Sequence, residues 1–134
     1  MKKQALFRAA AVFAFGAVLY PSLEVLWRGY SHYSMALAGG VACLLLYYLS
    51  ALYPAASRIL RAVIGGALIL VVEFTVGVIF NLFLGMNVWD YTGKPFALLG
   101  QVCPSYALLW CALGYLFAFL FDRMRKEMAE VAAA

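Results

Sequence analysis

The sequence predicts an all-α integral membrane protein whose four transmembrane helices pack as one compact bundle. Two observations lead to this fold class. The 134 residues are 67% hydrophobic and only 12% charged, with a mean hydropathy of +0.93, whereas soluble domains carry about 25% charged residues. The apolar residues also form four continuous runs, each near the roughly 20 residues that a helix needs to cross a bilayer. Open strands would leave backbone groups unpaired in lipid, so helices are the expected form.

The chain is expected to form a single membrane domain over residues 1–134, with helices at about 6–27, 35–53, 60–84 and 102–121. Lys2 and Lys3 resemble the start of a secretory signal, but Arg8 interrupts the run and no A-x-A site follows it. We therefore expect the first run to be an uncleaved span.

Two segments lie outside these runs. Residues 86–101 are expected to form an outer interfacial loop, because they are rich in aromatic residues and contain the turn signal Thr-Gly before Lys-Pro. Residues 122–134 are expected to form a short charged tail on the cytoplasmic side, as the frayed end of the last helix and not a separate domain.

The basic residues predict the orientation of the bundle. Of the 10 Lys and Arg residues, all but Arg28 and Lys94 flank one side of the runs. We expect the chain to lie in a bacterial inner (cytoplasmic) membrane. The positive-inside rule then places both termini on the cytoplasmic side. This distribution is a topology signal and differs from the basic face of a nucleic-acid binder, so the lipid bilayer and not nucleic acid is the expected partner.

Small residues recur at helical spacing and predict the faces on which the helices pack, because close backbone approach holds helices together in lipid. In the first run the predicted stripe comprises Ala10, Ala14, Ala17, Pro21, Glu24 and Arg28. In the third run it comprises Ala62, Gly66, Glu73, Gly77 and Asn81. Two of the predicted packing faces therefore carry an acid.

Glu73 is the most informative single residue, since it lies near the middle of the third run. An acid at the bilayer centre costs about 2.5–3.5 kcal/mol on insertion scales, so we expect Glu73 to be neutral or partnered. It could be a proton or cation site, or an anchor for a polar substrate. Alternatively, it could form only an interhelical hydrogen bond that fixes packing.

Further polar residues surround this position in the predicted bundle. Glu24 and Arg28 have the i, i+4 spacing of a helical ion pair, although Lys94 and His32 could also partner Glu24. Asn81 follows Glu73 on the same stripe, and Asp90 could cap a turn or pair with Lys94. His32 is the only histidine, and nothing in the spacing of His, Glu and Asp favours a metal site. We expect no cofactor.

The outer loop allows two interpretations. The loop could lie at the membrane–water interface as a plug, with its residues Trp89, Tyr91, Lys94, Pro95 and Phe96. They could instead form a lid over a polar cavity that contains Glu73.

A specific motif runs from the third helix into the fourth. It consists of Glu73 and Gly77, then Gly85, the run Trp89-Asp90-Tyr91-Thr92, the pair Pro95-Phe96, Gly100 and Cys103, and finally Trp110. This pattern resembles the membrane family described as putative ABC-transporter type IV, or CmpB-like. That family has an acid-bearing helix, a Trp-Asp-Tyr-Ser/Thr loop, a Pro-Phe pair and a Gly-x-x-Cys that enters the last helix.

The resemblance covers about residues 20–115, because the segment from Glu24 to Tyr30 is similar to the family's first helix and loop. The chain departs from the pattern at Asn81, where a second acid often stands, and near Ala97 and Leu99, where polar residues are common. The family name implies transport. The sequence has no Walker A loop, so any ATPase would be a separate chain.

Three functions follow as hypotheses. The first is a transporter or permease component with a polar site around Glu73, assembled as a homodimer or larger complex. The second is a structural or assembly subunit, and the third is an intramembrane enzyme, although no nucleophile–base spacing indicates catalysis. The first and third helices each carry an acid and precede an aromatic outer loop, so the bundle could also be a parallel repeat of two hairpins.

Overall fold

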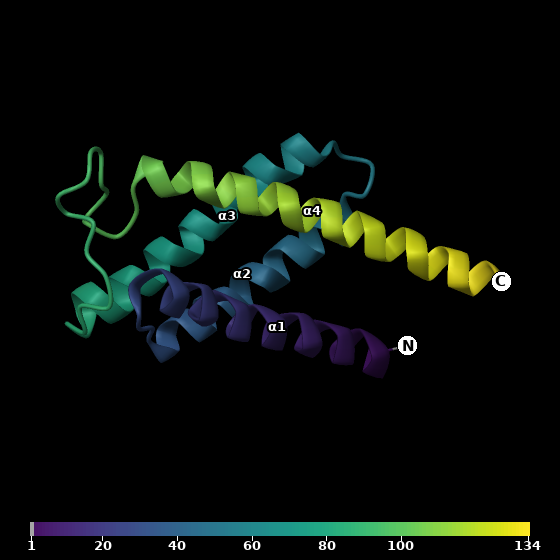
Figure 1. Ribbon diagram of the computed structural model, residues 1–134, viewed down its shortest axis with the longest axis horizontal. Helices are drawn as coiled ribbons and strands as arrows, with labels where there is room; N and C mark the ends of the chain where they lie inside the picture. The colour runs from purple at the N-terminus through teal and green to yellow at the C-terminus, as the bar shows by residue number, and fades with distance from the viewer. Residues whose placement is uncertain (1) are drawn as a thin grey trace.

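The computed structural model describes residues 2–134, which form four long helices and no regular strand (Figure 1). These are α1 (Lys2–Arg28), α2 (Tyr33–Leu52), α3 (Arg58–Gly77), which continues as the π-helix η1 (Val78–Phe83), and α4 (Pro104–Ala133). The four helices are long and apolar enough to cross a membrane. They pack as a bundle, so the predicted fold class is confirmed, and the chain is a multi-pass membrane protein.

The helices extend beyond the apolar runs that predicted them. Helix α1 begins at Lys2, and α4 continues through the predicted tail to Ala133. The apolar runs mark only the part of a helix that lies in lipid, whereas Lys, Arg, Glu and Ala are all good helix formers in water. Helix α4 begins at Pro104, whose missing N–H costs nothing in the first turn. The tail is therefore an extension of the last helix.

The helices alternate in direction, so the two termini lie at one end of the bundle together with the α2–α3 turn (Figure 1). The loop between η1 and α4 lies at the opposite end. Helix α1 packs mainly on α2 and α3 mainly on α4, while α2 also contacts α3 and α4. The bundle thus consists of two helical hairpins joined through α2. The equivalence of these hairpins as a repeat remains a prediction.

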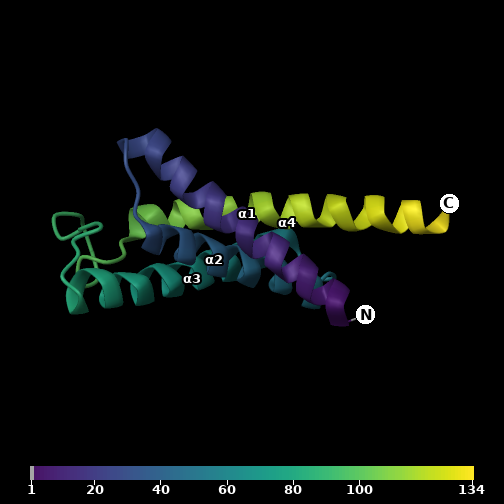
Figure 2. The ribbon, with the colours of Figure 1, turned by 90° about the horizontal axis from the view of Figure 1, so that it is seen from below.

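Helix α1 runs obliquely across the other helices (Figure 2), and its contact with α2 is centred on glycine. A Cβ atom at Gly16 would overlap the backbone carbonyl of Gly39, and a Cβ atom at Gly39 would overlap that of Gly16. Gly16 is the only buried residue of the described part of α1. The predicted stripe on this helix was therefore wrong in its first half, since Ala10 and Ala14 are exposed. Close backbone approach favoured glycine over alanine here.

Replacing Gly16 with leucine should separate α1 from α2. The new side chain has no space at the backbone contact, and overpacking of this kind costs about 1–3 kcal/mol. Titration of the purified protein with a denaturing detergent, followed by tryptophan fluorescence, measures the loss. Ala14→Leu is the matched control, because Ala14 is exposed on the same helix and should change stability by less than about 0.5 kcal/mol. Equal losses in the two variants would contradict the glycine contact.

Candidate functional site

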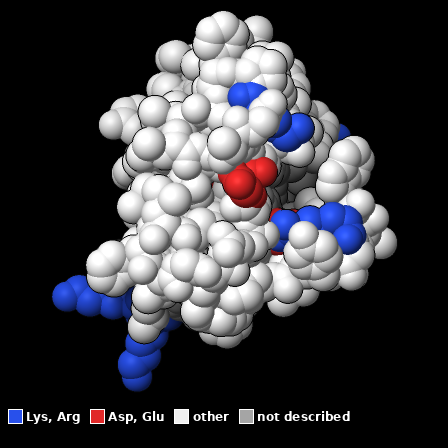
Figure 3. Space-filling model, turned by 90° about the vertical axis from the view of Figure 1, so that its left-hand side faces the viewer, with Lys and Arg blue, Asp and Glu red and all other residues white. Residues whose placement is uncertain are grey.

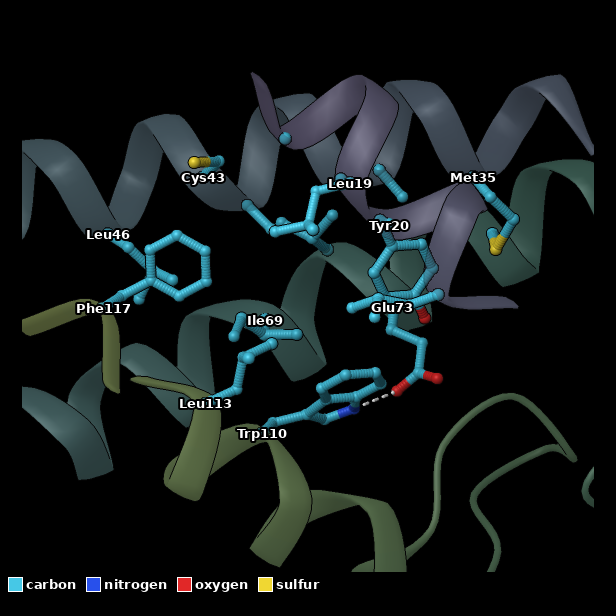
Figure 4. A pocket seen from close by; sticks show the side chains of 16 residues that line it. Leu19, Tyr20, Met35, Cys43, Leu46, Ile69, Glu73, Trp110, Leu113 and Phe117 are labelled. Atoms are coloured by element: carbon cyan, nitrogen blue, oxygen red, sulfur yellow. Dashed lines mark hydrogen bonds between the residues drawn. The ribbon is translucent and has the colours of Figure 1, made fainter. Parts of the chain in front are cut away.

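Glu73 lies on the inner face of α3, where only 6% of its surface is exposed. Two side chains from other parts of the chain donate hydrogen bonds to its carboxyl group. The Trp110 Nε1–H of α4 donates to Oε2 at 2.9 Å (Figure 4). The Tyr91 hydroxyl of the outer loop donates to Oε1 at 3.1 Å. The carboxyl group is thus held inside the bundle between a helix and a loop that are distant in sequence.

Neutral groups supply both of these bonds. Among residues 2–134, no ion pair joins Glu73 to a basic side chain. Burial raises the pKa of the Tyr91 phenol, and the neighbouring carboxyl group of Glu73 raises it further. Tyr91 therefore remains a protonated donor, and the Glu73 carboxyl group is solvated by hydrogen bonds without a counter-ion.

A cavity of about 50 Å³ lies beside this carboxyl group and is bounded by all four helices. Its walls are almost entirely apolar, with Leu19 and Tyr20 of α1, Met35 and Leu46 of α2, and Phe117 of α4 among the lining side chains (Figure 4). The rings of Tyr20 and Trp110 lie 5.7 Å apart beside Glu73. Among the described residues, Glu73 is the only acid on the walls, and the space is large enough for water.

Asn81 belongs to a second polar cluster, on η1. Its Nδ2 donates to Gln101 Oε1 at 2.9 Å, and its Oδ1 accepts from the backbone N–H of Val88 at 2.6 Å. Gln101 is 2% exposed, and its backbone carbonyl oxygen accepts a hydrogen bond from Trp89 Nε1 at 3.0 Å. These bonds fix the two ends of the outer loop to the end of the third helix.

Glu24 and Arg28 form the predicted i, i+4 ion pair, with 2.9 Å between Arg28 Nη2 and Glu24 Oε1. Glu24 also accepts a hydrogen bond from the Ser31 hydroxyl at 2.7 Å. Arg28 reaches the outer loop, where Nη1 donates to the Val88 carbonyl at 3.0 Å. The pair therefore ties the end of α1 to the outer loop, and it does not line the cavity beside Glu73.

The remaining residues of the predicted site and lid face outwards. Asp90 is exposed and accepts from the hydroxyl and the backbone N–H of Thr92, which together lower the pKa of its carboxyl group. Lys94 lies over the Tyr106 ring, with 5.5 Å from Nζ to the ring centroid. Pro95 is exposed, and Phe96 is 90% exposed. Figure 3 looks onto this end, where the few charged side chains border a hollow in a mostly uncharged surface.

The outer loop has an inward-facing part and an outward-facing part. Trp89 and Tyr91 fold inwards, with Trp89 only 9% exposed, whereas Lys94, Pro95 and Phe96 stay at the surface. None of the loop residues lines the cavity, so the cavity lies deeper than a space directly beneath the loop. Among the described residues, no group of three His, Cys, Asp or Glu side chains could hold a metal ion.

Sequence reasoning did not identify Trp110 and Gln101 as partners of the buried polar groups. Trp110 was noted only as part of a motif, and Gln101 only as a loop end. A signal was available, because Trp110 shares the small-residue face of α4 with Ala107, Cys111 and Gly114. A ring with an N–H donor on such a face requires a buried acceptor.

The comparison with protein families gives a match over residues 35–133, to the family described as "Putative ABC-transporter type IV". The match runs from the start of α2 to the end of α4, and it includes Glu73, Tyr91 and Trp110. The match does not reach Glu24 and Tyr30, which the resemblance based on sequence motifs includes. No curated protein and no solved structure matches the chain. Since the match covers well over half of the sequence, the chain belongs to the ABC-transporter type IV, CmpB-like, family of membrane proteins.

Proposed function

We propose that this chain is the membrane-embedded component of a transport system, with Glu73 as the group that holds a proton or a cation. One observation carries the proposal: a buried carboxyl group with only neutral partners forms part of the wall of a cavity between all four helices. An acid at this depth is costly. A hydroxyl or amide side chain could make a packing contact at lower cost, so the presence of an acid at this position supports a role for its proton or charge.

The walls of the cavity narrow the class of occupant. Apart from Glu73, the lining is apolar and aromatic, and ligand sites of this kind bury an apolar body while a few polar groups fix its orientation. The volume of about 50 Å³ is far below the roughly 300–1,000 Å³ of sites that hold larger ligands, so the proposed occupant is a proton or a small cation. Aromatic rings such as Tyr20 and Trp110 are also favourable neighbours for a cation.

Tyr91 supports a role for the outer loop as a lid. Its hydroxyl group donates the only hydrogen bond between the loop and Glu73 in the described part of the chain. Movement of residues 86–101 would break this bond and expose the carboxyl group to the outer side. In this proposal Trp89 and Tyr91 close the site, while Lys94, Pro95 and Phe96 form the outer surface of the lid.

The proposal extends to the cellular setting. The positive-inside rule supports cytoplasmic termini in an inner membrane, since the end that holds both termini carries eight of the ten Lys and Arg residues. Four helices are few for a complete permease, which supports a homodimer or larger complex. In an ABC-transport context, ATP hydrolysis would be performed by a separate chain.

Glu73→Gln in vesicles tests the proposal. Glutamine preserves the shape and both contacts, because its carbonyl oxygen accepts from Trp110 and its amide donates to the Tyr91 hydroxyl, which also accepts. Vesicles loaded with a pH-sensitive dye should acidify faster with the wild-type protein than without protein after an external acid jump. Glu73→Gln should return the rate to the protein-free background.

Asp90→Asn is the matched control, since it removes an exposed carboxylate from the outer loop and should leave the rate unchanged. Wild-type flux in Glu73→Gln would contradict the proposal. So would a wild-type rate no higher than that of empty vesicles.

A structural or assembly subunit is the second candidate. The observation that favours it is that both oxygens of Glu73 already accept hydrogen bonds from Tyr91 and Trp110. In that case Glu73→Gln would keep the assembly and every measurable function of its complex, because the substitution keeps both contacts.

A further inference from the structure

A cluster of charged side chains lies at the end of the bundle that holds the termini, away from Glu73. Its centre is Asp122 of α4, which is 8% exposed. Arg61 of α3 binds it with two hydrogen bonds, from Nη1 to Oδ1 at 2.9 Å and from Nη2 to Oδ2 at 2.8 Å. Arg58 Nε donates to Oδ2 at 3.0 Å, and Arg125 Nη2 donates to Oδ1 at 2.6 Å. Three guanidinium groups therefore surround one carboxylate.

The cluster has an excess of positive charge that no described residue neutralises. Each guanidinium has more N–H donors than a shared carboxylate can satisfy. Arg61 is 3% exposed, and its Nε atom has no hydrogen-bond partner in the described part of the chain. The nearest other acid along α4, Glu127, pairs with Arg123 at 3.5 Å. Two of the three positive charges are thus available to an external anion.

Arg58 and Arg125 are the members of the cluster that an external anion can reach. Their side chains are 37% and 43% exposed. The Arg58 guanidinium lies over the Phe119 ring, 5.3 Å from its centroid, and Tyr115 precedes Phe119 by one helical turn. Both rings are partly exposed on the surface of α4 that continues towards the middle of the membrane.

The neighbouring surface decides which kind of anion fits. An anionic site for a soluble ligand or an acidic protein would be surrounded by polar groups. Here the arginines border an apolar, lipid-facing surface, with Leu116 and Leu120 also exposed on the same helix. A molecule that joins an anionic head to an acyl chain matches both parts, and basic groups at helix ends bind such headgroups in other membrane proteins.

We propose that Arg58 and Arg125 bind the phosphate of an anionic phospholipid whose acyl chain lies on Tyr115 and Phe119. Asp122 and Arg61 hold the two arginines in place from inside the bundle. The site is separate from Glu73 and does not depend on the function proposed for that residue.

Lipid binding to the full chain in detergent tests the proposal. Native mass spectrometry would compare the binding of phosphatidylglycerol with that of phosphatidylcholine, both chosen with the same acyl chains. The wild-type protein should bind phosphatidylglycerol preferentially. Arg58→Gln should reduce this preference about fivefold, and Arg58→Gln with Arg125→Gln about 25-fold, since each basic group near an anionic lipid contributes a similar amount.

Arg123→Gln is the matched control, because it removes the same charge from an exposed position of the same helix, 63% exposed at the side chain, and should keep the preference. Arg58→Gln leaves Arg61 and Arg125 bound to Asp122, so it tests the site even if the double variant unfolds. An unchanged preference in Arg58→Gln would overturn the proposal, as would equal binding of the two lipids. Full displacement of the lipid by glycerol phosphate would instead identify a soluble-anion site and overturn the assignment to lipid.

Discussion

Replacing Asp122 with alanine should destabilise the protein by about 3–5 kcal/mol, the cost of leaving a buried charge without its partner. The charge left behind is Arg61, whose side chain is 3% exposed and whose two hydrogen bonds to Asp122 span α3 and α4. Arg58 and Arg125 lose their shared acceptor in the same change. Denaturing-detergent titration of the purified protein measures the free energy of unfolding.

Glu127→Ala provides the control for Asp122→Ala. Glu127 lies on the same helix and pairs with Arg123, but both side chains are more than half exposed. Exposed pairs contribute at most about 1 kcal/mol, so this variant should unfold nearly as the wild type does. A loss of stability in Asp122→Ala no greater than that in Glu127→Ala would show that the buried cluster does not hold α3 to α4.

Trp110→Ala should cost about 3–5 kcal/mol, the range for truncating a large buried aromatic side chain. Trp110 is 7% exposed and packs against Tyr20 and Tyr106. Its removal enlarges the cavity beside Glu73 and removes one of the two donors to that carboxyl group. The same titration measures the loss.

Trp110→Phe separates these two effects, because phenylalanine retains most of the ring and lacks the N–H donor. Loss of the single hydrogen bond should cost about 1–3 kcal/mol, since a buried acceptor is left unpaired. Trp27→Phe is the control, as Trp27 is 86% exposed and should change stability by less than about 0.5 kcal/mol. If Trp110→Phe were as stable as Trp27→Phe, the bond to Glu73 would contribute nothing.

The sequence was sufficient to predict the four helices and the burial of Glu73. Long apolar runs have few alternatives in a membrane, and an acid within such a run must face the protein interior. The small-residue stripe of α3 was also predicted correctly from Ala62 to Asn81, because each predicted member is buried. Local spacing was enough for the Glu24–Arg28 pair, whose partners lie one turn apart.

Interactions between distant parts of the chain could not be predicted from the sequence. Trp110 lies 37 residues from Glu73, and Arg61 lies 61 residues from Asp122. Nothing in either segment specifies its partner, since the pairing depends on how the two helices rotate when they pack. Asp122 was taken as the first residue of a charged tail, because hydropathy marks where an apolar run ends and not which charges are buried.

The crossing of α1 over α2 has a mechanical consequence. Because Gly16 and Gly39 carry no side chain at the crossing, rotation of α1 about that point is resisted by the surrounding contacts with α2, including Phe13 on Gly40 and Tyr20 on Gly39. Leu19 and Tyr20 of α1 line the cavity beside Glu73, so a change in the tilt of this helix would change the width of the cavity. The Arg28–Val88 bond is one of the restraints on α1, and its release would couple the outer surface of the protein to the space around Glu73.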